Sequence, residues 1–227
     1  MTSAPTRRFD PDYLRRLGSD PILFLRAVWT ADDKDGPAPL SPLDLRIANF
    51  LAHGKDRKVL LAMRGQGKTT IAQIVCVLFE AYRDPDRRFL IVSKSEKHAK
   101  RFVQNVKRLI HKIPFLRHLA PGPNRTNNEL EFDFGPSRGD TQPSIRAIGV
   151  GGMLEGNRAH HIIADDVETK RNTMTLESQT ELRRLCAEFP NILYKSDASY
   201  RHTDPFRITY LATVQVPDTI SASLTDP

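Results

Sequence analysis

The sequence predicts an α/β fold in which a mostly parallel central sheet is flanked by helices and preceded by a small helical N-terminal segment. Short apolar segments alternate with helical patterns along the chain, which is typical of parallel sheets. Each candidate motif directly follows an apolar segment, and ligand sites in such folds lie at the carboxyl ends of strands. The 227 residues, 39% of them hydrophobic and 27% charged, suit a globular domain of this kind.

The first part of the chain is predicted to be helical. Asp10–Pro11, Asp20–Pro21 and Ser41–Pro42 each join a capping residue to a proline at the first helical position. The predicted elements are helices over Tyr13–Leu17, Ile22–Trp29 and Leu43–His53, with a linker over Thr30–Leu40. We therefore expect a helical N-terminal segment and linker over residues 1–40 and one larger domain over residues 41–227.

The larger domain is predicted from alternating strand and helix patterns. The predicted strands cover Lys58–Ala62, Phe89–Val92, Leu130–Phe134 (a half-buried strand or hairpin arm), Ser144–Val150, His161–Ala164 and Arg207–Val214. The predicted helices cover Thr70–Ala81, a basic segment from a capping box at Ser93–Glu96 to about Lys112, and Thr175–Phe189. The loop Gly149–Gly156 carries four glycines.

The segment LLAMRGQGKTT, Leu60 to Thr70, is the central motif. A strand, a glycine-rich turn and a helix start together make an anion site, because backbone N–H groups and the helix dipole face the same point. In a P-loop the lysine reaches the β- and γ-phosphates and the following hydroxyl ligates Mg²⁺. We therefore predict that the chain binds ATP and Mg²⁺, with Lys68 and Thr69 as ligands.

The rest of the loop is expected to wrap the phosphates. Its predicted nucleotide-binding residues are Arg64, Gly65, Gln66, Gly67 and Thr70, in addition to Lys68 and Thr69. The pattern G-x-x-x-x-G-K-[ST] is incomplete, since Ala62 stands where the first glycine is expected. We expect Gly65 to supply the missing backbone freedom.

A second motif, HHIIADDVE, ends a hydrophobic strand on a pair of carboxylates. In P-loop NTPases such a strand delivers the aspartate that holds Mg²⁺, which makes Asp165 the candidate on the metal side. A neighbouring carboxylate can orient or deprotonate the attacking water. Asp166 and Glu168 compete for this role.

A third motif, YLATVQ, again ends a strand on small and polar residues. Thr213 and Gln215 could hydrogen-bond a γ-phosphate or its water and transmit the change. An ordinary strand end is the competing interpretation.

Charge and cysteine content narrow the functional classes. Lys and Arg exceed Asp and Glu by 34 to 27, and the segment Arg83 to Arg117 holds eleven basic and three acidic residues, a local excess of eight. Such a basic face suggests a polyanionic partner. Cys76 and Cys186 lie in helical patterns, which predicts buried free thiols. No secretory signal and no apolar run long enough to cross a bilayer are visible.

The ordered motifs resemble those of one family. The motif set resembles that of the ATPase domain of the terminase large subunit, the DNA-packaging motor of tailed bacteriophages. The set consists of an arginine-bearing P-loop, a strand ending in IVSKS before a basic helix, a glycine loop before HHIIADD, and ATVQ. The segment IIADDVE looks most like the corresponding segment of podovirus terminases. The resemblance spans about Leu40 to Pro217. The resemblance implies a P-loop NTPase fold of the ASCE type over residues 41–227.

The resemblance also implies roles for single residues. Arg64 matches an arginine of the family's P-loop, and Thr213, continued by Gln215, matches the motif that couples hydrolysis to motion. A trans-acting arginine from a neighbouring subunit is expected shortly before the acidic strand, where Arg158 lies, with Arg101 as the second candidate. Asp44 occupies the region that contacts adenine in the family, where glutamine is common.

Further implications concern partners and location. The resemblance implies translocation of double-stranded DNA into a procapsid. The motor would be a homo-oligomeric, pentameric ring on a portal protein, with a small terminase subunit as a further partner. It would act in the host cell cytoplasm, without a membrane. Members usually have glutamate where this chain has Asp166, and they carry a C-terminal nuclease domain that we expect to be absent from this chain.

Three alternatives stay open at this point. A helicase-like nucleic-acid-dependent ATPase would need a second motor domain. A small-molecule kinase would need an arginine-rich lid and would leave the basic segment unexplained. A non-hydrolysing DNA-binding module with a decayed nucleotide site is compatible with Ala62 and with the paired aspartates.

Overall fold

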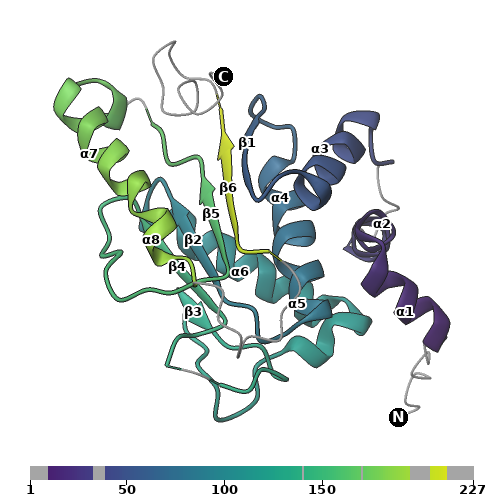
Figure 1. Ribbon diagram of the computed structural model, residues 1–227. Helices are drawn as coiled ribbons and strands as arrows, with labels where there is room; N and C mark the ends of the chain where they lie inside the picture. Colours follow the sequence, from purple (N-terminus) through teal and green to yellow (C-terminus); the bar gives the residue numbers. More distant parts are fainter. Residues whose placement is uncertain (1–9, 33–38, 140, 170, 195–204, 214–227) are drawn as a thin grey trace.

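A six-stranded sheet forms the centre of the computed structural model, which describes residues 10–32, 39–139, 141–169, 171–194 and 205–213 (Figure 1). Its strands are β1 (Arg57–Leu61), β2 (Phe89–Ser93), β3 (Glu131–Phe132), β4 (Ile145–Gly149), β5 (His161–Asp165) and β6 (Arg207–Ala212). Their order is β1-β6-β5-β2-β4-β3, and all neighbours pair in parallel except β3 with β4. The prediction of a mostly parallel sheet is therefore confirmed.

Strand β6 lies between β1 and β5, although it comes last in the sequence. Leu211 of β6 pairs with Leu60 on one side and with Asp165 on the other. On the far side of β5, Asp165 pairs with Ser93 at the end of β2. The carboxyl ends of these strands therefore meet at one edge of the sheet.

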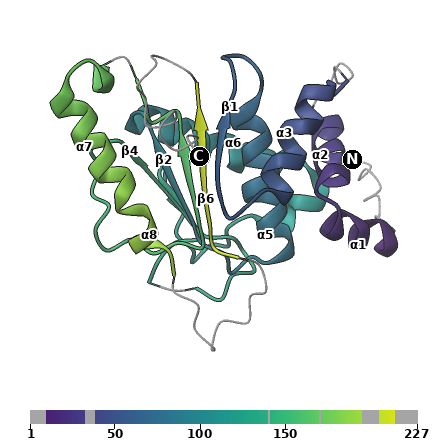
Figure 2. The same ribbon diagram turned by 45° about the horizontal axis from the view of Figure 1, so that its top comes forward.

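Helices cover both faces of the sheet (Figures 1 and 2). The helices are α1 (Pro11–Ser19), α2 (Pro21–Asp32), α3 (Pro42–His53), α4 (Lys68–Ala72), α5 (Phe79–Arg83), α6 (Glu96–Lys112), α7 (Leu176–Ala187) and α8 (Phe189–Ile192), with a π-helical segment at Gln73–Leu78 and 3₁₀ turns at Pro114–Leu119 and Arg171–Thr173. Among the described residues, no helix combines the length and apolar character needed to cross a membrane.

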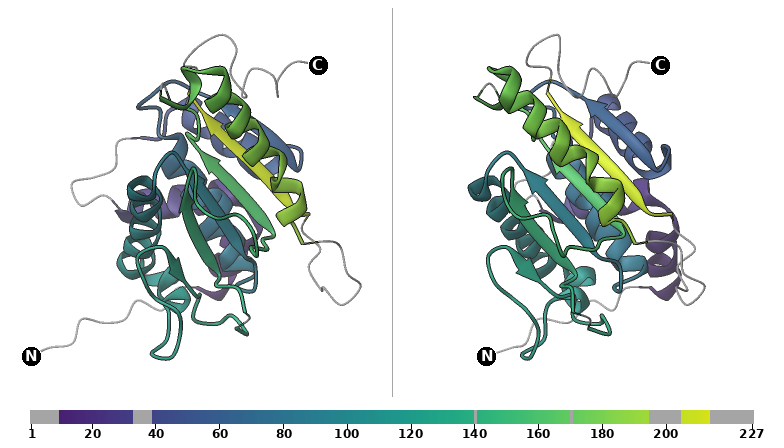
Figure 3. Two further views of the ribbon diagram at one scale, coloured as in Figure 1. Left: turned by 90° about the vertical axis from the view of Figure 1, so that its left-hand side faces the viewer. Right: turned by 60° about the vertical axis from the view of Figure 1, so that its left-hand side comes forward.

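Alternation along the strands divides the core into two clusters. Ile91, Ile163 and Leu211 face the larger cluster, which the helices α1 to α6 cover. Neighbouring residues such as Leu90 and Ile162 point to the opposite face and join a smaller cluster under α7 and α8. Figure 3 shows α7 and α8 lying along β5 and β6 on that face. Strands buried on both faces explain why their sequences are continuously apolar.

The N-terminal helices pack on the larger cluster. Phe24 of α2 meets the rings of Phe79, Tyr82 and Phe115 with centroids 5.4 to 5.8 Å apart. Helix α2 continues to Asp32, beyond the predicted end at Trp29, so the linker begins later than expected. The proposed division between residues 40 and 41 stays a prediction.

Two local predictions differ from the structure. The helix after the P-loop begins at Lys68 and widens into the π-helical segment, in which the N–H of Phe79 reaches the carbonyl of Ile74. The predicted capping box at Ser93–Glu96 is wrong, because β2 extends to Ser93, whose hydroxyl donates to the Asp165 carbonyl. Ser95 occupies the N-cap position of α6 instead, and its hydroxyl contacts His98 Nδ1 at 2.8 Å rather than a backbone N–H of the helix.

Candidate nucleotide-binding site

The loop between β1 and α4 turns at its glycines. Gly65 and Gly67 have φ angles of +83° and +66°, a region that residues with a side chain rarely adopt. Ala62 does not need this freedom, since Asp166 is the sole non-glycine residue with positive φ in the described part of the chain. The prediction that Gly65 supplies the turn is confirmed, and alanine at position 62 causes no backbone strain.

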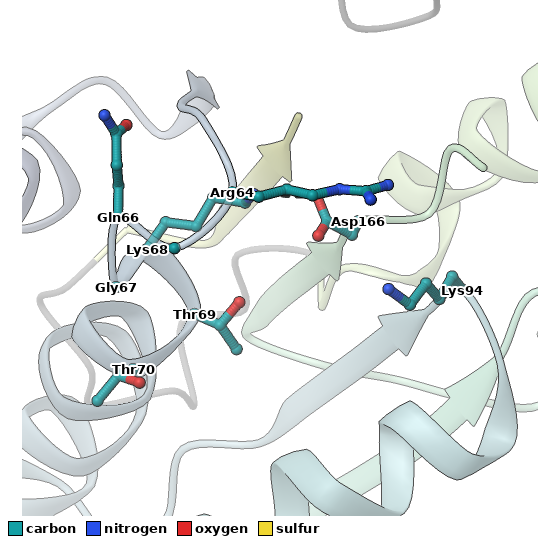
Figure 4. Close-up of a pocket in the computed structure, with 9 residues that line it drawn as sticks. Arg64, Gln66, Gly67, Lys68, Thr69, Thr70, Lys94 and Asp166 are labelled. Atoms are coloured by element: carbon teal, nitrogen blue, oxygen red, sulfur yellow. Dashed lines mark ion pairs between the residues drawn. The ribbon is translucent and has the colours of Figure 1, made fainter. Parts of the chain in front are cut away.

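A cavity of about 400 Å³ opens beside this loop, at the carboxyl ends of the strands (Figure 4). Its lining consists of Arg64, Gly65, Gln66, Gly67, Lys68, Thr69, Thr70, Lys94 and Asp166. All seven predicted P-loop residues therefore reach one space. Figure 4 shows the Arg64 side chain extending across it toward the side that carries Asp166.

Three of the predicted residues contact one another: Lys68 and Asp166, which line this cavity, and Thr213, which follows β6. The Lys68 ammonium lies 3.2 Å from Asp166 Oδ1 and donates to Thr213 Oγ1. The Thr213 hydroxyl in turn donates to Asp166 Oδ1 at 3.0 Å. The P-loop lysine, a carboxylate and the end of β6 are thus joined directly.

Asp166 adopts an unusual backbone conformation. Its φ is +49°, and its N–H donates to the carbonyl of Leu211 at 2.8 Å. Aspartate tolerates this left-handed region better than longer or branched residues, because its short side chain can bond locally. The conformation turns the carboxylate back toward the P-loop.

Thr69 and Asp165 form the second contact between the P-loop and the acidic strand. The Thr69 hydroxyl donates to Asp165 Oδ1 at 2.8 Å. Burial raises the pKa of Asp165 to about 6; the Thr69 hydrogen bond lowers it and the neighbouring Asp166 raises it further. Burial disfavours the charged form of this carboxylate, and a nearby cation would stabilise that charged form.

The donor set fits Mg²⁺. A hydroxyl and a carboxylate are hard oxygen ligands, and Mg²⁺ in nucleotide sites takes few protein ligands, with water and phosphate oxygens supplying the others. Within the described ranges, no group of three or more His, Cys, Asp or Glu side chains could hold a metal unaided. Thr69 and Asp165 would be the residues that hold the ion.

Several of the predicted residues lie outside this site. Glu168 is buried on the other side of Asp166, in a small pocket with Tyr210 and Ala212. Arg158 is exposed before the amino end of β5 and donates to the Asn157 carbonyl. Gln215 lies outside the described residues.

Asp44 also lies away from the cavity lining. It forms the capping box of α3, where its Oδ2 accepts from the backbone and hydroxyl of Ser41. Its other oxygen lies 3.8 Å from the position that a Cβ on Gly67 would take, so Asp44 sits directly behind the P-loop.

Lys94 is the lining residue that sequence reasoning missed. It follows β2 directly, in the same position after a strand that Asp166 occupies after β5. This position after an apolar strand was the available signal, but the strand order needed to use it cannot be read from the motif.

The basic segment is only partly a solvated face. Arg87 is buried and pairs with Glu80 at 3.0 Å, and Arg88 is buried as well. Arg108 and Lys112 on α6 both pair with Asp32 of α2. A share of these charges therefore holds the fold together, and the polyanionic partner stays a prediction.

The sheet order and the glycine turn between β1 and α4 define a domain with the P-loop NTPase fold. No family model matches the chain. The chain is 35% identical over 212 residues to the terminase large subunit of Enterobacteria phage T3, a match that covers 93% of this chain and 34% of that protein. This similarity confirms the predicted resemblance to the large terminase subunit of bacteriophages. The chain spans about a third of the length of that relative.

A solved structure supports the fold. The HK97 bacteriophage large terminase aligns with a TM-score of 0.52 and 13% identity, covering 86% of this chain and 37% of that one. The large terminase of a thermophilic bacteriophage, solved with ATP-gamma-S, aligns more loosely, with a TM-score of 0.45 and 15% identity over 77% of this chain and 38% of that one.

Proposed function

We propose that this chain is the ATP-hydrolysing motor domain of a viral DNA-packaging terminase, which translocates double-stranded DNA into a procapsid. The observation that carries the proposal is a set of direct contacts between three strand ends beside one cavity: Lys68, Thr69 and Asp166 line the cavity, Asp165 accepts from Thr69, and Thr213 contacts both Lys68 and Asp166. The similarity to the phage T3 protein supports the biological setting.

The chemistry assigned to the site is hydrolysis of the γ-phosphate. Lys68 and the loop amides would bind the phosphates, while Thr69 and Asp165 hold Mg²⁺, which neutralises phosphate charge when bound. As a water oxygen bonds to the γ-phosphorus, the bond to the β–γ bridging oxygen breaks and Asp166 accepts the proton of the water. ADP and phosphate result. Asp166 is preferred to Glu168, because only Asp166 lines the cavity.

Coupling to motion is assigned to Thr213. Its hydroxyl accepts from Lys68 and donates to Asp166, so a phosphate that draws the lysine away would change the contacts of Thr213 at the end of β6. Gln215 is retained as the continuation of this motif, and Asp44, behind Gly67, as the residue nearest the base.

The remaining assignments concern the assembly. We propose a pentameric ring on a portal protein in the host cytoplasm, with a small terminase subunit and double-stranded DNA as partners. Arg158 lies beyond the amino end of β5, while the cavity lies at its carboxyl end. Arg158 could therefore act only on the cavity of another subunit, and Arg101 is the second candidate.

The test is steady-state ATPase activity with Mg²⁺ over a wide range of protein concentration, with and without double-stranded DNA. Lys68→Ala should abolish turnover, and Lys97→Ala, at an exposed position of α6 outside the cavity lining, is the matched control. Turnover per subunit that rises with concentration would support a site completed by a neighbour. Activity no higher than that of Lys68→Ala at any concentration would refute hydrolysis and favour the non-hydrolysing DNA-binding module.

A further inference from the structure

Lys94 occupies a position in the cavity that the P-loop mechanism leaves unused. Ser93, the last residue of β2, pairs with Asp165 of β5. Lys94 therefore stands beside Asp166 at the carboxyl ends of two adjacent strands, and its side chain lines the same cavity as the P-loop (Figure 4).

The Lys94 ammonium is available to a ligand. Within the residues that the structure describes, Lys94 has no ion-pair partner and no side-chain hydrogen bond, whereas Lys68 is held by Asp166 and Thr213. The Lys94 ammonium is therefore left to contact a ligand that enters the cavity.

The strand order defines which phosphate Lys94 would meet. The P-loop follows β1, and Lys94 follows β2, three strands away in the order β1-β6-β5-β2. At about 4.8 Å per strand this separates the two attachment points by about 14 Å. The loop amides take the α- and β-phosphates and Lys68 reaches the β- and γ-phosphates, so the γ-phosphate is the one that extends across the cavity toward Asp166 and Lys94.

We infer that Lys94 binds the terminal phosphate of a nucleoside triphosphate within its own subunit and thereby distinguishes the triphosphate from the diphosphate. The inference rests on the proposed function, because it requires nucleotide binding in this cavity. It assigns Lys94 to ligand recognition. Because α6 begins two residues later, loss of that phosphate would change the contacts at the start of α6.

The test compares two probes on the whole chain, Mg²⁺ with the non-hydrolysable AMPPNP and Mg²⁺ with ADP, by isothermal titration calorimetry. Lys94→Met removes the charge and keeps the length of the side chain. Loss of one charge-assisted hydrogen bond should weaken AMPPNP binding about tenfold to a hundredfold. ADP affinity should change by less than about threefold, since ADP has no phosphate at that end.

Two variants control for structural effects. Lys94→Arg should recover most of the AMPPNP affinity, and Lys97→Met, at an exposed position of α6 outside the cavity lining, should leave both affinities unchanged. Equal losses for AMPPNP and ADP, or no loss, would overturn the assignment of Lys94 while leaving nucleotide binding intact. Failure of the unaltered chain to bind either probe would instead refute the proposed function, and this inference with it.

Discussion

The buried carboxylate of Glu80 is predicted to carry a measurable share of the stability of the fold. Glu80 lies in α5 and contacts Arg87 at 3.0 Å and both Arg207 and His161 at 3.1 Å. These partners belong to the segment before β2 and to the amino ends of β6 and β5. The cluster therefore fixes the two strands whose other ends carry Thr213 and Asp165.

The pKa of Glu80 gives the magnitude. Burial alone would raise it, but the ion pairs with Arg87 and Arg207 and the hydrogen bond from His161, whose own pKa burial lowers, bring it from 4.5 to about 2. This difference corresponds to about 3 kcal/mol of folding free energy at neutral pH. Removing one partner of a buried ion pair costs a similar amount, about 3 to 5 kcal/mol, because the remaining charge stays buried.

We therefore expect Glu80→Gln to lower the free energy of unfolding by about 3 kcal/mol at pH 7, measured by urea denaturation. Since the folded pKa is below the unfolded one, the contribution is complete above pH 4.5 and is lost as the pH falls toward 2. At pH 4 the difference between the two proteins should be about 1 kcal/mol smaller than at pH 7.

Glu129→Gln is the control, because Glu129 forms an exposed ion pair with Lys100 at 2.9 Å. Its effect should stay within about 1 kcal/mol, as is usual for surface pairs. A Glu80→Gln effect no larger than that of Glu129→Gln, or one that is the same at pH 7 and pH 4, would refute the reasoning.

Three further predictions concern the site and the strand that leads to it. Thr213→Val should reduce ATP turnover at least about tenfold with little change in nucleotide affinity, since a hydrogen bond to a charged group is lost. Thr213→Ser should restore turnover. A parallel loss of turnover and of nucleotide affinity in Thr213→Val would argue for a binding role instead. Asp166→Asn keeps a side chain that tolerates the left-handed backbone, so turnover should fall at least about 100-fold while nucleotide still binds; the same result from Glu168→Gln alone would transfer the role to Glu168. Lys58→Met should lower the free energy of unfolding by about 1 to 3 kcal/mol, measured by thermal unfolding. The reason is that the buried Lys58 ammonium donates at 2.8 and 3.3 Å to two carbonyls at the end of α3. An unchanged melting temperature would contradict this.

Much of the candidate site was predictable because its signals are local. The glycine-lysine-threonine turn and the strand ending in two aspartates are each contiguous in sequence, and each follows an apolar segment. Parallel strands bring such ends to one edge of the sheet, so Lys68, Thr69 and Asp166 could be expected to lie together. Glu168 shows the limit of this reasoning. It is only two residues beyond Asp166, yet it does not line the P-loop cavity and instead lines the small pocket beside Tyr210.

Buried charges were the least predictable feature. Arg87, Arg108 and Lys112 count as positive charges in the sequence, and a basic face was the natural interpretation. Their partners Glu80 and Asp32 approach only when α2, α5 and α6 pack on the sheet. Composition records how many charges a segment has, but the tertiary contacts decide which of them remain for a ligand.

The sequence by itself determined the elements and the chemistry of their ends, because strand and helix periods, glycine turns and capping residues act over a few neighbours. The tertiary structure alone decided that β6, the last strand, inserts between β1 and β5, which brings Thr213 within hydrogen-bonding distance of both Lys68 and Asp166. It also put Lys94 in the same cavity. These contacts join residues that are far apart in the chain, and their pairing depends on how whole strands order themselves to bury both faces of the sheet.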